Sequence, residues 1–172
     1  MIMLLRTLLV ALIPASALAQ GMEVTVKDPG FNVSIPDLAS FELGTHPNAS
    51  GQPTAKLMGS STDGVSLSVL TPTADPETTA AQCASWLAGN VVSRFAPNLD
   101  ALQIVKAGEN AWVLLFPFEV ATVKQLKAYV VSGNGKGHCL EVHISRTMPT
   151  DAQRQQWLAG FRKITVRAEQ AR

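Results

Sequence analysis

Apolar and polar residues alternate in two stretches of the first half of the chain. Residues 31–35 and 65–69 place an apolar side chain at every second position, with Asn or Ser between them. A period of two predicts β-strands that each have one buried and one solvated face. Residues 23–28 alternate more weakly, and residues 41–43 form a further candidate strand before a Gly-, Pro-, Asn- and Ser-rich loop over residues 44–55. This part of the chain is therefore predicted to consist of strands and turns.

A helical period replaces this alternation after residue 74. Asp75, Pro76 and Glu77 supply an N-cap acid, a proline at the first helical position and a second acid near the positive end of the helix dipole. Apolar side chains then recur at intervals of three or four residues, at Ala80, Cys83, Leu87, Val91 and Phe95. The pattern predicts a helix of about five turns that begins at Asp75 and ends before Pro97, with Cys83 on or beside its buried face.

The second half begins with a nearly continuous apolar run over residues 111–120. A strand of this kind is covered on both faces, which requires a layer of structure on each side of its sheet. Pro117 cannot donate a ladder hydrogen bond, so it marks a bulge or the end of central pairing. Residues 124–132 and 138–145 are predicted strands, and the glycine-rich segment 133–137 joins them as a hairpin loop.

The chain ends with a further helix and strand. Thr150 and Gln153 have the spacing of a capping box, and a helix through about Lys163 follows them. Trp157, Leu158 and Phe161 form its apolar stripe, and residues 164–166 are a candidate last strand. The predicted fold class is α+β: an α/β/α sandwich in which a central, mostly antiparallel sheet carries the long helix and the C-terminal helix on opposite faces.

The first nineteen residues have the pattern of a secretory signal. Arg6 precedes the apolar run 8–13, and Ala17-Leu18-Ala19 places small residues where a signal peptidase cleaves. The run is too short, and too interrupted, to span a bilayer. We therefore expect cleavage near Ala19–Gln20, a periplasmic or secreted protein without stable membrane insertion, and one globular domain over residues 20–172.

The composition is that of a globular protein with a core, at 47% hydrophobic and 16% charged residues. The net charge of +1 hides an asymmetry, because residues 20–123 carry four basic and ten acidic side chains, and residues 124–172 carry nine basic and three acidic ones. One interpretation is a basic surface for anionic envelope lipid or polysaccharide. The favoured interpretation is that the halves interleave in one sheet and neutralise each other, since no basic run is dense. No nucleic-acid partner is expected.

Two cysteines, Cys83 and Cys139, remain in a chain expected to reach an oxidising compartment. An even count there predicts one disulfide. The alternative is a small thiol hydrolase that uses Cys83 with His138 or His143 as its base. Such chemistry needs an exposed thiolate near a helix N-terminus, whereas Cys83 lies about two turns into its predicted helix. A disulfide between the two cysteines would exclude this alternative.

Cys139, Glu141 and His143 share one face of their strand because side chains alternate. They are metal-ligand types, but a metal site needs a further ligand, so neither a metal, a cofactor nor a catalytic group is predicted. Trp86 falls one position off the apolar stripe of its helix and is predicted to line a groove. A candidate binding surface combines it with three lysines: Lys124, Lys127 and Lys136.

Several segments together resemble a known family. Residues 31–36 are similar to the "phe-x-val-x-ile-pro" strand that begins PsbP-like and DcrB-like domains. The resemblance continues through the helix after Asp75, the strand entry at 108–112, the strand at 129–133 and the terminal helix. It implies an α/β/α sandwich and a non-enzymatic binding or assembly module that acts through protein contacts.

These observations predict a secreted or periplasmic module that recognises another envelope or secreted protein through an exposed sheet edge or helix face. The thiol hydrolase and the binder of anionic lipid or polysaccharide remain the alternatives.

Overall fold

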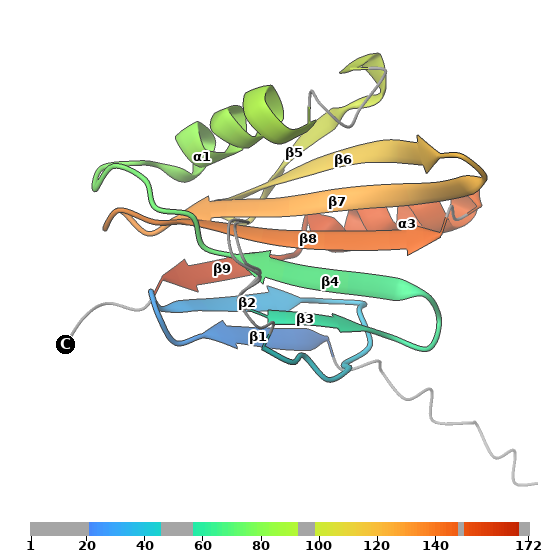
Figure 1. Cartoon of the computed structure of the whole chain (residues 1–172), viewed down its shortest axis with the longest axis horizontal. Helices are drawn as coiled ribbons and strands as arrows, with labels where there is room; N and C mark the ends of the chain where they lie inside the picture. The colour runs from blue at the N-terminus through green and yellow to red at the C-terminus, as the bar shows by residue number, and fades with distance from the viewer. Residues whose placement is uncertain (1–20, 46–56, 93–98, 148–149, 169–172) are drawn as a thin grey trace, which may run out of the picture.

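The computed structural model describes residues 21–45, 57–92, 99–147 and 150–168. The predicted signal segment, residues 1–19, lies outside the described residues. Within the described ranges the chain folds into two antiparallel sheets and two α-helices (Figure 1).

A six-stranded sheet forms the centre of the molecule, and every neighbouring pair in it is antiparallel. The strands in spatial order are β3 (Leu57–Ser60), β4 (Val65–Leu70), β8 (Cys139–Thr147), β7 (Val123–Gly133), β6 (Ala111–Val120) and β5 (Gln103–Ala107). The strands expected at 65–69, 111–120, 124–132 and 138–145 are confirmed. The candidate strand at 41–43 is reduced to one bridge, between Gly44 and Met58.

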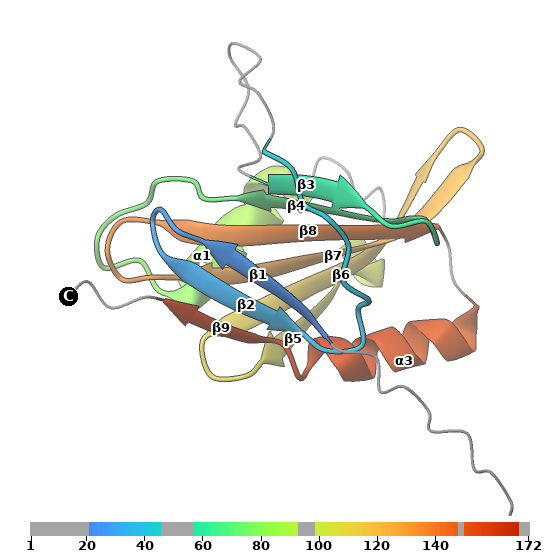
Figure 2. The same cartoon turned by 90° about the horizontal axis from the view of Figure 1, so that it is seen from below.

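The strands at the two ends of the chain form a second, separate sheet, which a prediction of one central sheet did not anticipate. It contains β1 (Met22–Val26), β2 (Phe31–Ile35) and β9 (Thr165–Ala168). Their inward side chains pack with those of the central sheet in one hydrophobic core. Helix α3 (Asp151–Phe161) lies on the same side, and its Thr150–Gln153 capping box is confirmed. Figure 2 shows this layer from below.

Helix α1 (Ala80–Leu87) covers the opposite face, over β6, β7 and β8. Its predicted start at Asp75 is wrong: Thr79 is the N-cap, and its hydroxyl accepts from the backbone N–H of Gln82. Gln82 Oε1 in turn accepts from the Thr79 N–H at 2.8 Å. A reciprocal pair of bonds satisfies two terminal donors, which the acid–proline signal at residue 75 could not do. The α-helix ends at Leu87 and continues as a π-helical turn, Ala88–Val92.

The α+β sandwich is thus confirmed, with helices on opposite faces of the central sheet. Strand β6 shows why both layers are needed, because Val113 and Leu115 pack toward the small sheet and Leu114 and Phe116 pack toward α1. Pairing with β5 ends at Leu115, two residues before Pro117, so the proline marks the point where β6 keeps only one neighbour.

The acidic and basic halves of the chain interleave, as the favoured interpretation of the charge asymmetry required. Strands β7 and β8, from the basic half, lie between β4 and β6, from the acidic half. Three ion pairs between described residues join one half to the other: Lys124 with Glu119 at 3.7 Å, Arg146 with Asp63 at 3.6 Å and Lys163 with Asp37 at 4.0 Å.

Candidate functional site

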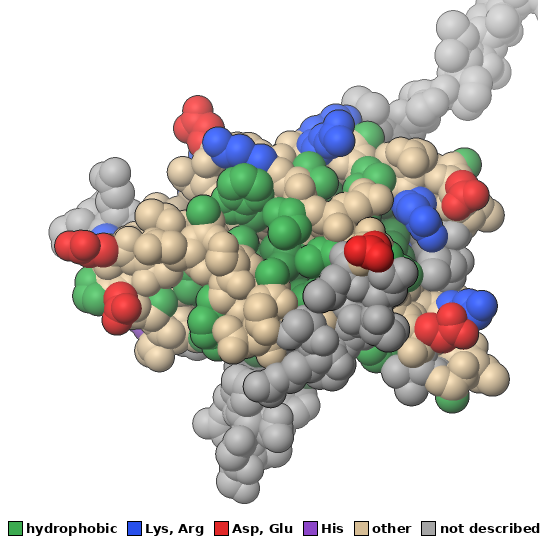
Figure 3. All heavy atoms as spheres, turned by 90° about the horizontal axis from the view of Figure 1, so that it is seen from above, with side chains coloured by type: hydrophobic (Ala, Val, Ile, Leu, Met, Phe, Trp, Pro, Cys, Tyr) green, Lys and Arg blue, Asp and Glu red, His purple; other side chains and the backbone are tan. Residues whose placement is uncertain are grey.

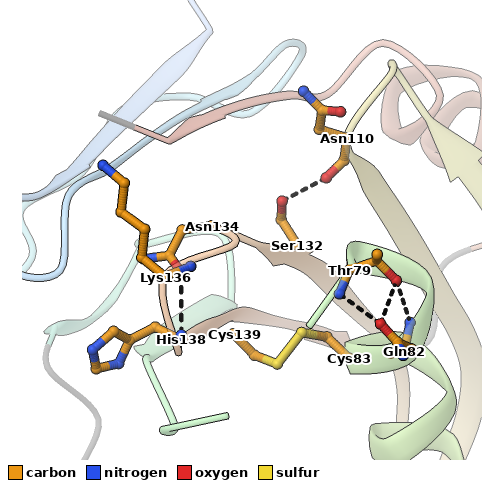
Figure 4. Close-up of a disulfide and its surroundings, with 9 residues drawn as sticks. All are labelled: Thr79, Gln82, Cys83, Asn110, Ser132, Asn134, Lys136, His138 and Cys139. Carbon is orange, nitrogen blue, oxygen red and sulfur yellow. Dashed lines mark hydrogen bonds between the residues drawn. A yellow bond between two sulfur atoms is a disulfide. The ribbon is translucent and has the colours of Figure 1, made fainter. Parts of the chain in front are cut away.

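A disulfide joins α1 to the start of β8 and confirms the predicted cysteine pair (Figure 4). The Cα atoms of Cys83 and Cys139 are 5.8 Å apart, and both side chains are buried. Since these are the only cysteines of the chain, no thiol remains. Figure 4 also shows the imidazole of His138 pointing away from the sulfur atoms. The thiol hydrolase alternative is therefore excluded, because its nucleophile is consumed by the crosslink.

The segment before α1 is fastened beside the disulfide by backbone hydrogen bonds. The N–H of Cys139 donates to the carbonyl of Pro72 at 3.0 Å, and the N–H of Ala74 donates to the carbonyl of Gly137 at 2.8 Å. Thr73 and His138 form a β-bridge between the same two segments. The chain thus enters α1 along a fixed path, so the wall that it forms is preorganised.

This wall and α1 enclose a groove of about 590 Å³, with the disulfide in its lining. We call it the disulfide groove, and its lining residues are Pro72, Thr73, Ala74, Asp75, Thr78, Gln82, Cys83, Trp86 and Cys139. Trp86 stands on α1 with 53% of its surface exposed. The sequence-based expectation that Trp86 lines a groove is therefore confirmed, and among the lining residues that the structure describes Asp75 is the one with a charged side chain.

Glu141 and His143 lie together on the face of the central sheet that α1 covers. The Glu141 carboxylate is buried, and its Oε2 lies 3.1 Å from His143 Nε2. The Tyr129 ring stacks on His143, with centroids 4.0 Å apart and an interplanar angle of 22°. Burial, followed by the charge of Glu141, raises the pKa of Tyr129 to about 12. The alternation of side chains predicts that Glu141 and His143 share one face, but it gives no sign of Tyr129, which the strand register brings opposite His143.

His143 also lines a shallow groove over β3, β4 and β8, beside three serines: Ser66, Ser68 and Ser145. In the described part of the chain, no group of three or more His, Cys, Asp or Glu side chains could hold a metal ion. Cys139, the third metal-ligand type on this face, is occupied by the disulfide.

Two of the three candidate lysines lie on β7, and the third lies in the loop that follows it. Lys124 is exposed at the β6–β7 turn and pairs with Glu119. The Lys127 ammonium lies 3.8 Å from the centroid of the Phe118 ring, and burial lowers its pKa. Lys136 lies in the β7–β8 loop near the disulfide (Figure 4). At about 3.3 Å per residue, the length of β7 separates Lys124 from Lys136 by roughly 30 Å. The fold does not bring these two lysines together.

Exposed apolar side chains accompany Trp86 on other elements. Ile104 on the edge strand β5 and Val123 at the start of β7 are each about half exposed, with relative exposures of 52% and 51%. Figure 3 views the molecule from the α1 side, and hydrophobic side chains gather in the middle of this face. The exposure of Ile104 could not be predicted, because a β-branched residue in a short strand gives no signal that the strand lies at a sheet edge.

Comparisons with known proteins identify the fold. No family model matches the chain, and a search of curated proteins finds no significant match. The solved structure of cyanobacterial PsbP (CyanoP) from Synechocystis sp. PCC 6803 matches this chain with 13% sequence identity and a TM-score of 0.53. The match covers 90% of this chain and 97% of CyanoP. A Bacteroides thetaiotaomicron protein is 12% identical with a TM-score of 0.51 over 88% of this chain, which spans about half (49%) of that protein.

A third solved structure is LpqN of Mycobacterium tuberculosis, a protein involved in cell envelope biogenesis. It is 14% identical with a TM-score of 0.47, covering 84% of this chain and 90% of its own. The match to CyanoP shows that the chain has a PsbP-like fold, which confirms the resemblance at the level of fold.

The disulfide is one observation that bears on the location of the protein. A buried disulfide is compatible with an extracytoplasmic compartment, where such bonds persist. Within the described ranges, no helix has the length and apolar character needed to cross a membrane.

Proposed function

We propose that this chain is a secreted or periplasmic, non-enzymatic binding module that recognises another protein through the disulfide groove. The observation that carries the proposal is Trp86, a large aromatic side chain that stands half exposed at the rim of a preorganised groove. Tryptophan is among the residues that most often dominate binding energy at protein interfaces.

The rigidity of the groove supports the same function. The disulfide fixes α1 to β8, and the bridge between Thr73 and His138 fixes the opposite wall. A site that is already ordered loses little conformational entropy when a partner binds. The groove suits an extended partner segment that places an apolar side chain against Trp86 and the disulfide, since both lie in its lining.

The lining also favours binding over catalysis. Thr78 and Gln82 offer hydroxyl and amide groups, Asp75 offers a carboxylate, and the two cysteines of the lining are joined in the disulfide, so neither is a nucleophile. The polar groups can orient a partner segment by hydrogen bonds. With Asp75 as the charged group, a basic residue in that segment is complementary.

The test places a photoreactive phenylalanine analogue at position 86 of the full chain, expressed in its native host. A matched protein carries the same group at position 123, because Val123 is equally exposed but lies at the start of β7, away from the groove. We expect a discrete cross-linked partner from position 86 and not from position 123.

Binding of the purified partner then gives the affinity. Trp86→Ala is expected to weaken binding at least tenfold, since hot-spot truncations cost about 2 kcal/mol or more. Val123→Ala is expected to change binding less than twofold. Equal cross-linking at both positions, or an affinity insensitive to Trp86→Ala, would overturn the proposal.

A further inference from the structure

A second cavity lies on the other side of the central sheet, where the C-terminal part of α3 approaches the end of β2 (Figure 2). We call it the α3 pocket, and it is defined here by Ile35, Asp37, Ile144, Arg146, Trp157 and Phe161. Its volume is about 210 Å³, the liquid volume of about seven water molecules. The cavity is therefore too small for a drug-sized ligand and matches a small metabolite.

The inner part of the α3 pocket is apolar. Ile35, Ile144 and Phe161 are all almost fully buried, and the Trp157 ring packs edge-on against Phe161 with centroids 5.3 Å apart. An apolar group that enters the pocket is thus removed from water against aliphatic and aromatic surface, which is favourable.

Two charged side chains of opposite sign line the same cavity. The Arg146 guanidinium lies over the Trp157 ring, 5.4 Å from its centroid. Its ion partner is Asp63, at 3.6 Å from one terminal nitrogen. Since a guanidinium has five N–H donors, one long ion pair leaves most of them available to a ligand. Arg146 therefore supplies a site for a carboxylate beside the apolar interior.

Asp37 supplies the negative charge, and its backbone has an unusual conformation. Its φ of 64° lies in the left-handed region, which a residue with a side chain rarely adopts. Gly160 of α3 lets the helix approach, because a Cβ there would lie 3.2 Å from Asp37 Oδ2. Lys163 is 4.0 Å from the same oxygen, so the carboxylate keeps room for a closer cation.

We propose that the α3 pocket binds a free apolar α-amino acid. Arg146 holds its carboxylate, Asp37 holds its ammonium group, and its side chain enters the apolar interior against Trp157 and Phe161. A ligand with one charge would use only one of the two lining charges, and a monocarboxylate would meet Asp37 as a like charge. A zwitterion with an apolar side chain uses both. This site is separate from the disulfide groove, so it stands independently of the function proposed above.

The experiment titrates the ¹⁵N-labelled protein with L-phenylalanine and follows the indole N–H of Trp157 and the backbone amide of Ile144 by NMR. We expect saturable shifts there with a Kd of about 1 mM or lower, and none at the Trp86 indole. Two ligand analogues test the charges on the unchanged protein. Both 3-phenylpropanoate, which lacks the ammonium group, and phenethylamine, which lacks the carboxylate, are expected to bind about tenfold more weakly.

Protein variants test the same contacts. Arg146→Gln and Asp37→Asn are each expected to weaken binding about tenfold, and asparagine tolerates the left-handed backbone of position 37. The matched control is Asp63→Asn, which removes the partner of Arg146 without touching the cavity and should leave affinity unchanged or tighter.

Three results would overturn the proposal. One is the absence of saturable shifts at Trp157 with L-phenylalanine. Another is equal binding of 3-phenylpropanoate, which would make the charge of Asp37 irrelevant. The third is an equal loss of binding in Asp63→Asn and Arg146→Gln, which would assign Arg146 a purely structural role.

Discussion

Tyr129 is the only tyrosine of the chain, so its ionisation can be followed by itself. Burial and the neighbouring charge of Glu141 raise its pKa from 10.0 to about 12. The folded state therefore disfavours the phenolate more than the unfolded state does. Stability from this group is fully present below pH 10 and is lost as the pH rises through 12.

The magnitude follows from the two pKa values. A rise from 10.0 to about 12 changes the ionisation equilibrium about 100-fold, which corresponds to about 2.7 kcal/mol. Helix α1 covers this face only in part, and His143 beside Tyr129 lines an open groove. Because solvent screening reduces the effect, we expect the free energy of unfolding to fall by about 1–2 kcal/mol between pH 10 and 12.

The assay is the absorbance of tyrosinate at 295 nm between pH 8 and 13, measured within seconds of a pH jump and paired with near-ultraviolet circular dichroism. The Glu141→Gln variant is the control, because it removes the smaller cause of the pKa shift of Tyr129. The midpoint of the tyrosine titration should therefore fall in this variant but remain above pH 10. A titration midpoint near pH 10 in protein that keeps its native dichroism would contradict the raised pKa of Tyr129, because the phenol would then be as solvated as in the unfolded chain.

Two further predictions concern how α1 is held. Replacing Cys83 and Cys139 together by alanine removes a crosslink across a sequence separation of 56 and should lower the free energy of unfolding by about 4 kcal/mol, measured by urea denaturation; an unchanged midpoint would contradict this. Gly133→Ala places a Cβ 2.6 Å from the carbonyl oxygen of Thr78 and should cost about 1–3 kcal/mol. Gly89→Ala, whose Cβ meets nothing within 4 Å, is the matched control and should be neutral or stabilising in the same assay.

Local signals predicted local structure well. Thr150 and Gln153 form the capping box that their spacing indicated, and the period of two placed the strands at 31–35 and 65–69. The helix after Asp75 shows the limit of such signals, since Thr79 and Gln82 offered a second start that could make both capping bonds. The position of the helix N-terminus depends on where the chain leaves the β-bridge between Thr73 and His138. This bridge is a tertiary contact, which local sequence signals do not show.

Strand partners could not be predicted in the same way. The pattern at 31–35 indicates one buried face but not what buries it, and the partner of β2 on one side is β9, about 130 residues later in the chain. Alternation also left open whether one sheet or two would form, because both arrangements bury the same side chains. Helix α3 ends close to β2, so the strand that follows it, β9, pairs with β2 and not with the central sheet.

The candidate sites lie where the structure departs from local rules. Trp86 exposes about half of its side chain on α1, and Asp37 has a φ of 64°, in the left-handed region that favours glycine. Each of the two residues lines a cavity. Consistent local and global preferences stabilise a fold, so departures from them mark positions where another requirement acts. Trp86 and Asp37 both line cavities, and the two binding functions proposed above would account for their placement.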